Sequence, residues 1–130
     1  MIVVDASAVV EVLLQNAKAD IAEQWLLNPQ RSKHAPHLLD MEVAHSIRRY
    51  ATAGLIDAEL GRAALGNLLA FSIRRYPHQA LLPRIWDLRH NMSAYDAAYV
   101  ALAELLEAPL LTFDARLASA ARRHVGIEVL

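Results

Sequence analysis

The chain has 130 residues, of which 55% are hydrophobic and 21% charged, and its formal net charge is −1. This length is typical of one domain with a sizeable core, and the near-neutral charge argues against a protein that holds polyanions through bulk charge. Cysteine is absent, which excludes disulfides and thiolate–metal sites and fits a reducing compartment. The apolar runs are too short to span a membrane, and too few residues precede Asp5 for a signal segment. We therefore expect a cytoplasmic protein without a membrane partner.

The spacing of hydrophobic residues predicts strands that alternate with helices along the chain. Ile2–Val4 is a run of β-branched residues, typical of a strand buried on both faces, and Gly54 and Pro109 are residues at which helices end. On the second expected helix, Ile21 and Trp25 are predicted to face the core, with Ala22 and Leu26 as further candidates. The alternation predicts an α/β fold: one domain over residues 1–130, with a parallel sheet and helices on both faces. In chain order, the expected elements are a strand at 2–4, helices at 7–14 and 19–27, a strand at 32–35, helices at 37–53 and 57–71, a strand at 72–76, helices at 82–90 and from 93 to before 109, a strand at 110–112, a helix at 115–124 and a strand at 127–129.

The helix that begins at Ser93 has a carboxylate near its start and an apolar surface beyond it. Ser93 is a good N-cap, and Asp96 follows at the spacing of a capping box. From Ala97 to Ala103 only the hydroxyl of Tyr99 interrupts the apolar residues, and a helix that is apolar all round is a buried helix. Asp96 is therefore expected at the rim of a buried element, where a carboxylate without a partner is costly.

Three more acids are expected near Asp96, at one edge of the sheet. Asp5 directly follows the first strand, and Asp114 closely follows the strand at 110–112. Because ligands bind at the carboxyl ends of parallel strands, both acids should border one crevice. The helix of Asp96 runs antiparallel to the strand it precedes, so its start faces the same edge. Glu42 lies in the first turns of another such helix.

Each of these four acids has a simpler explanation when it is taken alone. Asp5 and Asp114 can be N-caps, Asp96 a capping-box acid and Glu42 a solvated charge. All four together are harder to explain in this way, because like charges in a partly dry crevice raise one another's pKa. A divalent cation relieves that repulsion, and carboxylate oxygens favour Mg²⁺ or Mn²⁺. No His-rich or Cys spacing in the sequence favours zinc.

Four segments resemble, in the family's order, the acidic motifs of PIN-domain ribonucleases, and together they span nearly the whole chain. The third segment is particularly similar to VapC-type toxins of bacterial and archaeal toxin–antitoxin pairs. The resemblance implies a PIN-like fold and a metal-dependent endoribonuclease that acts as the toxin of such a pair. The segments are Val4-Asp5-Ala6-Ser7-Ala8, Leu39-x-x-Glu42-Val43-Ala44, Tyr95-Asp96-Ala97-Ala98-Tyr99 and Leu111-Thr112-Phe113-Asp114.

Carried over residue by residue, the resemblance implies a set of site residues and a metal cofactor. The catalytic acids would be Asp5, Glu42, Asp96 and Asp114, with Asp5, Asp96 and Asp114 as metal ligands and the hydroxyls of Ser7 and Thr112 orienting the cluster. The expected cofactor is Mg²⁺, with Mn²⁺ as its substitute. Some relatives carry a further acid shortly after the last motif, where this chain has Ala115 and Arg116. This departure leaves the number of ions open, and one Mg²⁺ is expected.

The implied reaction is hydrolysis of RNA phosphodiester bonds, in which the ion activates a water and neutralises developing charge. Arg89, Arg116, Arg122 and Arg123 are candidates to contact the RNA backbone; the alternative is solvated helix faces with salt bridges. The expected partners are RNA, a cognate small antitoxin and a second copy of the chain in a homodimer. A housekeeping RNA-processing PIN nuclease and a catalytically inactive PIN interaction module remain as alternatives.

Two other kinds of acidic α/β site fit the sequence less well. A phosphatase of the haloacid dehalogenase type needs a second aspartate two residues after Asp5, where this chain has Ser7. A phospho-receiver domain needs a lysine at the end of a late strand. The two lysines, Lys18 and Lys33, both come early, so this second class is excluded.

Overall fold

The computed structural model describes residues 1–129, and its centre is a parallel sheet. The five strands of this region lie in the order β3-β2-β1-β4-β5, and every neighbouring pair runs parallel. This arrangement confirms the predicted α/β fold. The strands are β1 (Ile2–Val4), β2 (Lys33–Pro36), β3 (Ile73–Tyr76), β4 (Leu110–Thr112) and β5 (Ile127–Val129).

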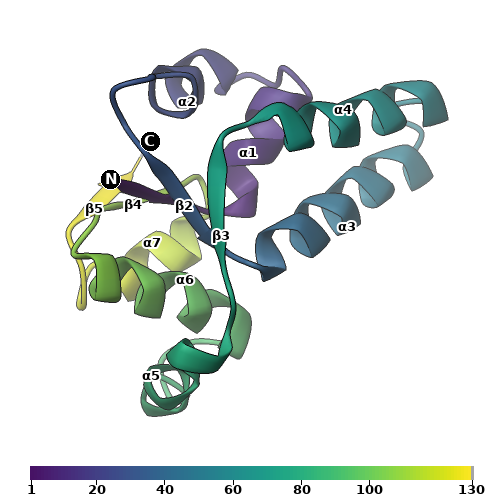
Figure 1. Cartoon of the computed structure of the whole chain (residues 1–130). Helices are drawn as coiled ribbons and strands as arrows, with labels where there is room; N and C mark the ends of the chain where they lie inside the picture. Colours follow the sequence, from purple (N-terminus) through teal and green to yellow (C-terminus); the bar gives the residue numbers. More distant parts are fainter. Residues whose placement is uncertain (130) are drawn as a thin grey trace.

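Helices cover both faces of the sheet, as expected for right-handed connections between parallel strands. Helices α1 to α4 lie on one side, and α5 to α7 lie on the other (Figure 1). Helices α3 and α4 pack against each other and project from the body as a hairpin (Figure 1). The helices are α1 (Ala6–Leu13), α2 (Ala19–Leu26), α3 (Leu38–Thr52), α4 (Ala58–Ala70), the short 3₁₀ helix η1 (Gln79–Leu81), α5 (Leu82–Asp87), α6 (Ala94–Leu106) and α7 (Ala115–Ala121).

The core lies around β1 and α6. All three residues of β1 are fully buried, as the β-branched run predicts for a central strand. Every residue of α6 from Ala97 to Ala103 is buried as well, which confirms the prediction of a buried helix. None of the helices between residues 1 and 129 combines the length and hydropathy that a membrane span requires.

Several local predictions are wrong in detail. Ile21 was expected to face the core but is 42% exposed, whereas the further candidates on α2, Ala22 and Leu26, are buried together with Ala19. Helices α5 and α7 are each three residues shorter than predicted, since turns replace their last residues. The 3₁₀ helix before α5 was not predicted. The spacing of apolar residues defines an apolar stripe along a helix. Which residues of that stripe are buried depends on the element that packs against it.

Strand β3 accommodates two adjacent arginines because it lies at the edge of the sheet. The Arg74 guanidinium lies 5.2 Å from the ring centroid of Tyr76. Arg75 Nε and Nη2 donate to the carboxylate of Asp40 at 2.7 and 2.8 Å, in a forked ion pair. This pair ties the first turn of α3 to the sheet, and α3 carries Glu42.

Successive strands are added first on one side of β1 and then on the other, so the strand order reverses between β1 and β4. From β1 it proceeds through β2 to β3, and it then returns past β1 to β4 and β5. A parallel sheet opens a crevice outside the carboxyl ends of the two strands at such a reversal. Val4 pairs with Leu111 in this register, so the residues that follow these strands lie beside one another.

Candidate acidic site

Asp5 lies at the crevice and is the most buried of the four acids, with 6% of its surface exposed. It directly follows β1 and is the N-cap of α1, because its Oδ1 accepts a hydrogen bond from the Ala8 backbone N–H at 3.2 Å. The simple explanation of Asp5 as a cap is therefore correct, although it is incomplete. Burial raises the pKa of Asp5 to about 6, against the hydrogen bonds it accepts, and the charge of Asp114 raises it further.

Two hydroxyl groups hold the carboxylate of Asp5 in place. Ser7 Oγ donates to Oδ1 at 2.7 Å, and Thr112 Oγ1 donates to Oδ2 at 2.7 Å. Each hydroxyl also accepts a backbone N–H from the loop after β4: Ser7 from Phe113 at 2.8 Å and Thr112 from Asp114 at 2.9 Å. The ends of β1 and β4 are thus linked through one carboxylate. These hydrogen bonds support the prediction that Ser7 and Thr112 orient the acidic cluster.

Asp114 is also a helix cap, and only one of its oxygens is used. Its Oδ1 accepts from the backbone N–H groups of Arg116 and Leu117 at 2.9 and 3.2 Å, at the start of α7. Among residues 1–129, Oδ2 has no hydrogen-bond partner. One oxygen is therefore available to a ligand while the other fixes the helix start.

Asp96 differs from Asp5 and Asp114 because it does not cap a helix. Ser93 caps α6 by accepting the Asp96 backbone N–H at 3.2 Å, so the carboxylate of Asp96 is not needed for the cap. Its ion partner is Arg116 Nη2, at 3.5 Å from Oδ2. Burial raises the pKa of Asp96, the Arg116 charge opposes this and the Asp114 charge adds to it. The capping-box explanation therefore does not account for this carboxylate.

Glu42 comes to the site from the second turn of α3, and Tyr99 of α6 holds it. Tyr99 Oη donates to Glu42 Oε1 at 2.6 Å, and the tyrosine is only 1% exposed. Burial raises the pKa of Glu42, the Tyr99 hydrogen bond lowers it, and the charges of Asp96 and Asp114 raise it. The sequence signal of this contact was Tyr99 as the polar residue in an apolar helix, but nothing in the sequence identified its partner.

The four acids line one cavity of about 610 Å³, which we call the acidic cleft. The structure thus brings together all of the predicted acids, from four different elements or their edges. Ser7 lines the same cavity, and Thr112 lies beneath it, fully buried. Further lining residues that the sequence did not single out as site residues are Ala6, Leu38, Met41, His45, Ser46, Arg49, Tyr95, Tyr99 and Leu117.

The donor set of the acidic cleft fits a hydrated divalent cation. Its charged donors are carboxylate oxygens. Burial is the largest cause of the raised pKa values of Asp5, Glu42 and Asp96, and the charges of neighbouring acids add to it; a bound cation would favour the charged forms. Within residues 1–129, no three His, Asp or Glu side chains stand close enough to hold an ion directly. Mg²⁺ commonly keeps several of its waters and binds through one or two carboxylates. Those waters would span the distances between the carboxylates.

The predicted arginines lie in different surroundings. Arg116 borders the acidic cleft through Asp96, and Arg123 lies on the same side of α7, in a pocket with Arg116. Arg89 stacks on the ring of Trp86, 4.3 Å from its centroid. Arg122 is exposed and outside that pocket. The structure therefore groups two of the four arginines and leaves the other two apart.

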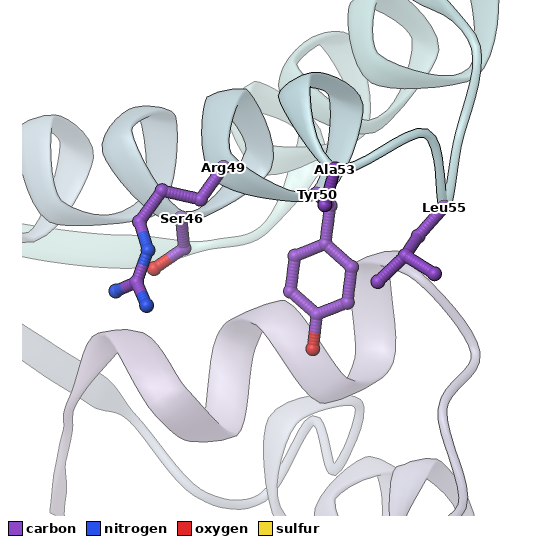
Figure 2. Close-up of a pocket in the computed structure, with 5 residues that line it drawn as sticks. All are labelled: Ser46, Arg49, Tyr50, Ala53 and Leu55. Atoms are coloured by element: carbon purple, nitrogen blue, oxygen red, sulfur yellow. The ribbon is translucent and has the colours of Figure 1, made fainter.

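A second cavity of about 470 Å³ adjoins the acidic cleft along α3. Ser46 and Arg49 line both cavities. Figure 2 shows the ring of Tyr50 reaching from α3 toward α1, with Arg49 on one side of it and Leu55 on the other. The two cavities form a continuous groove along α3, and Met41 and Leu55 on it are 73% and 70% exposed.

Comparisons with known proteins agree with this geometry. The family model described as PIN domain matches residues 2–123. Ribonuclease VapC1 of Mycobacterium tuberculosis is 49% identical over 119 residues, which cover 91% of this chain and 89% of the relative. The structure of VapC20 of the same species, a sarcin-ricin loop cleaving toxin, matches with a TM-score of 0.71 at 18% identity, covering 92% of this chain and 95% of that chain. VapBC2 from Rickettsia felis, bound to a DNA fragment from its promoter, matches with a TM-score of 0.71 at 13% identity, covering 99% of this chain and 98% of that chain.

Proposed function

Because the chain belongs to the PIN-domain family, among relatives named VapC ribonucleases, we propose that it hydrolyses RNA phosphodiester bonds at the acidic cleft with a divalent cation. In this proposal it acts as the toxin of a toxin–antitoxin pair. The observation that carries the metal-dependent mechanism is the gathering of Asp5, Glu42, Asp96 and Asp114 around one cavity, with three of their pKa values raised. Such a cluster is costly to a fold unless a cation occupies it.

Some side chains of the acidic cleft would hold the ion, and others orient the carboxylates that hold it. Asp5 is fixed by two hydroxyls and a backbone N–H, so its oxygens keep one orientation. Asp96 and Asp114 each have an oxygen without a hydrogen-bond partner within residues 1–129 that can take a water of the ion's shell. Glu42 is held by Tyr99 on the facing side. When bound, the ion supplies a water of lowered pKa and neutralises charge on the phosphoryl oxygens.

The groove along α3 supports an antitoxin as the protein partner. Its rim is apolar at Met41 and Leu55, and its floor leads into the acidic cleft. A helical or extended antitoxin segment would cover the apolar rim and place a Lys or Arg against the acids. The homodimer suggested by the sequence remains part of this proposal, and light scattering at micromolar concentration checks it.

Cleavage of total RNA by the purified protein tests the proposal. We expect cleavage with Mg²⁺ or Mn²⁺ and none in EDTA, and we expect cleavage to fall by orders of magnitude in Asp96→Asn. Asp20→Asn is the matched control, because Asp20 is an exposed acid of α2, outside the cleft. Undiminished cleavage in EDTA, or equal cleavage by Asp96→Asn and Asp20→Asn, would contradict the proposed mechanism.

A further inference from the structure

A pocket of about 450 Å³ is lined by Arg116, whose ion pair with Asp96 connects it to the acidic cleft. One wall is a stripe of α7 and the turn that follows it, with Arg116 in the first turn of the helix and Arg123 in the turn after its end. Between these two arginines the pocket is lined by the small side chains of Ser119 and Ala120. The other wall is the turn between α5 and α6. The lining residues, here called the arginine pocket, are His90, Asn91, Arg116, Ser119, Ala120 and Arg123.

Both walls of the arginine pocket are anchored by buried residues. The turn between α5 and α6 is held by Leu88, which is 1% exposed. Helix α7 is held by Leu117, Ala118 and Ala121, none more than 1% exposed. The polar groups that line the pocket are exposed, but the backbone that carries them packs on the core. Their arrangement is therefore built into the fold, which lowers the entropy cost of binding.

The charge of the arginine pocket is only partly neutralised by neighbouring acids. Arg116 has one ion partner, Asp96 at 3.5 Å, and its side chain is 80% exposed. An ion pair so exposed contributes little, so Arg116 can exchange Asp96 for another anion at small cost. Within residues 1–129, Arg123 has no ion pair. All of the polar groups that line the pocket can donate hydrogen bonds.

We propose that the arginine pocket binds a backbone phosphate of the RNA strand next to the scissile bond. This inference rests on the proposed ribonuclease function and names a substrate subsite for it. Two guanidinium groups beside an amide suit a phosphate oxygen, and Arg116 places the pocket directly beside the acidic cleft. A strand cut at the cleft therefore meets the pocket with a neighbouring phosphate. Because the contact is to the backbone, it positions RNA without reading sequence.

Arg123→Gln tests this subsite, with Arg122→Gln as the matched control. The two residues are adjacent and both exposed, but only Arg123 lines the pocket. The probe is a fluorescent single-stranded RNA, with binding measured in EDTA, where no cleavage is expected, between about 50 and 200 mM salt. We expect Arg123→Gln to weaken binding roughly 5- to 10-fold and to reduce the salt slope by about 0.7. Arg122→Gln should leave both values at the wild-type level.

Cleavage kinetics with Mg²⁺ give the second readout. For an RNA that the wild type cuts, Arg123→Gln should raise KM by the same factor and leave kcat unchanged. Equal binding by the two variants, or an equal loss in both, would overturn the subsite. Wild-type protein that binds RNA through Arg123 but never cleaves would support the subsite and contradict the proposed function. If the wild type cleaves RNA but Arg123→Gln has an unchanged KM, the result would support the proposed function and contradict the subsite.

Discussion

Replacement of Asp5 by Asn should stabilise the metal-free protein at neutral pH. Asp5 is buried, and its pKa in the folded protein is about 6, against an ordinary value of 3.8. A carboxyl group with a raised pKa favours folding in its protonated form. The contribution of protonated Asp5 to stability is therefore complete below pH 3.8 and is lost as the pH rises through about 6.

The size of this stabilisation follows from the difference between the pKa of Asp5 in the folded protein and its ordinary value. One pKa unit corresponds to about 1.4 kcal/mol, so the interval from 3.8 to about 6 corresponds to about 3 kcal/mol at pH 7. Asn is neutral and nearly the same shape, so it removes this penalty. Its Oδ1 can still accept from Ser7 and Ala8. Its Nδ2 can donate to Thr112 Oγ1 after that hydroxyl rotates.

Thermal unfolding of the wild type and of Asp5→Asn in EDTA checks the prediction. We expect Asp5→Asn to melt about 10 °C higher than the wild type at pH 7 and at nearly the same temperature near pH 4. Asp20→Asn, the exposed control, should show no such gain. Added Mg²⁺ should stabilise the wild type and not Asp5→Asn. A lower melting temperature for Asp5→Asn at pH 7 would refute the reasoning, because it would mean that the hydrogen bonds to the carboxylate outweigh its burial.

Three further substitutions test other contacts of the acidic cleft. Tyr99→Phe removes the donor to Glu42 and should cost about 1.5–3 kcal/mol in the free energy of unfolding and lower kcat. Tyr95→Phe removes the hydroxyl of an exposed tyrosine of the same helix and should leave the free energy of unfolding unchanged; a Tyr99→Phe variant as stable as Tyr95→Phe would show that the bond to Glu42 does not stabilise the fold. Thr112→Val leaves two buried polar groups without partners and should cost about 2–5 kcal/mol in urea unfolding, a loss that the nearly isosteric Thr112→Ser should largely avoid. Asp96→Asn should melt no lower than the wild type without metal, since the arginine of the ion pair it loses is 80% exposed and the change removes one of several gathered negative charges. Its stabilisation by Mg²⁺ should shrink; a lower melting temperature with an intact Mg²⁺ response and intact RNA cleavage would mark Asp96 as structural only.

The sequence alone determined the order of strands and helices and the edge at which the acids gather. Hydrophobic spacing is a local property, so a β-branched run such as Ile2–Val4 indicates a buried strand without knowledge of its neighbours. The handedness of parallel connections then limits the sheet to few arrangements. Asp5 and Asp114 could be placed beside each other because each follows a strand of that sheet.

The tertiary structure decided which atoms meet across the cleft. The contact between Tyr99 and Glu42 joins residues 57 positions apart, and that between Thr112 and Asp5 joins residues 107 apart. Neither spacing leaves a periodic signal, because the register depends on how α3, α6 and the sheet pack. The same packing decided that Asp5 and Asp114 are caps and that Asp96 is not.

The arginine pocket is a further result of packing. The sequence drew attention to Arg89, Arg116, Arg122 and Arg123 equally, as exposed cations on helices. Only the contact between α7 and the turn after α5 separates the pair in the pocket from the other two. The same face of this segment carries Arg116, in the first turn of α7, and Arg123, in the turn after the helix. Which neighbour that face meets, and therefore what it can bind, depends on how the two segments pack on the core.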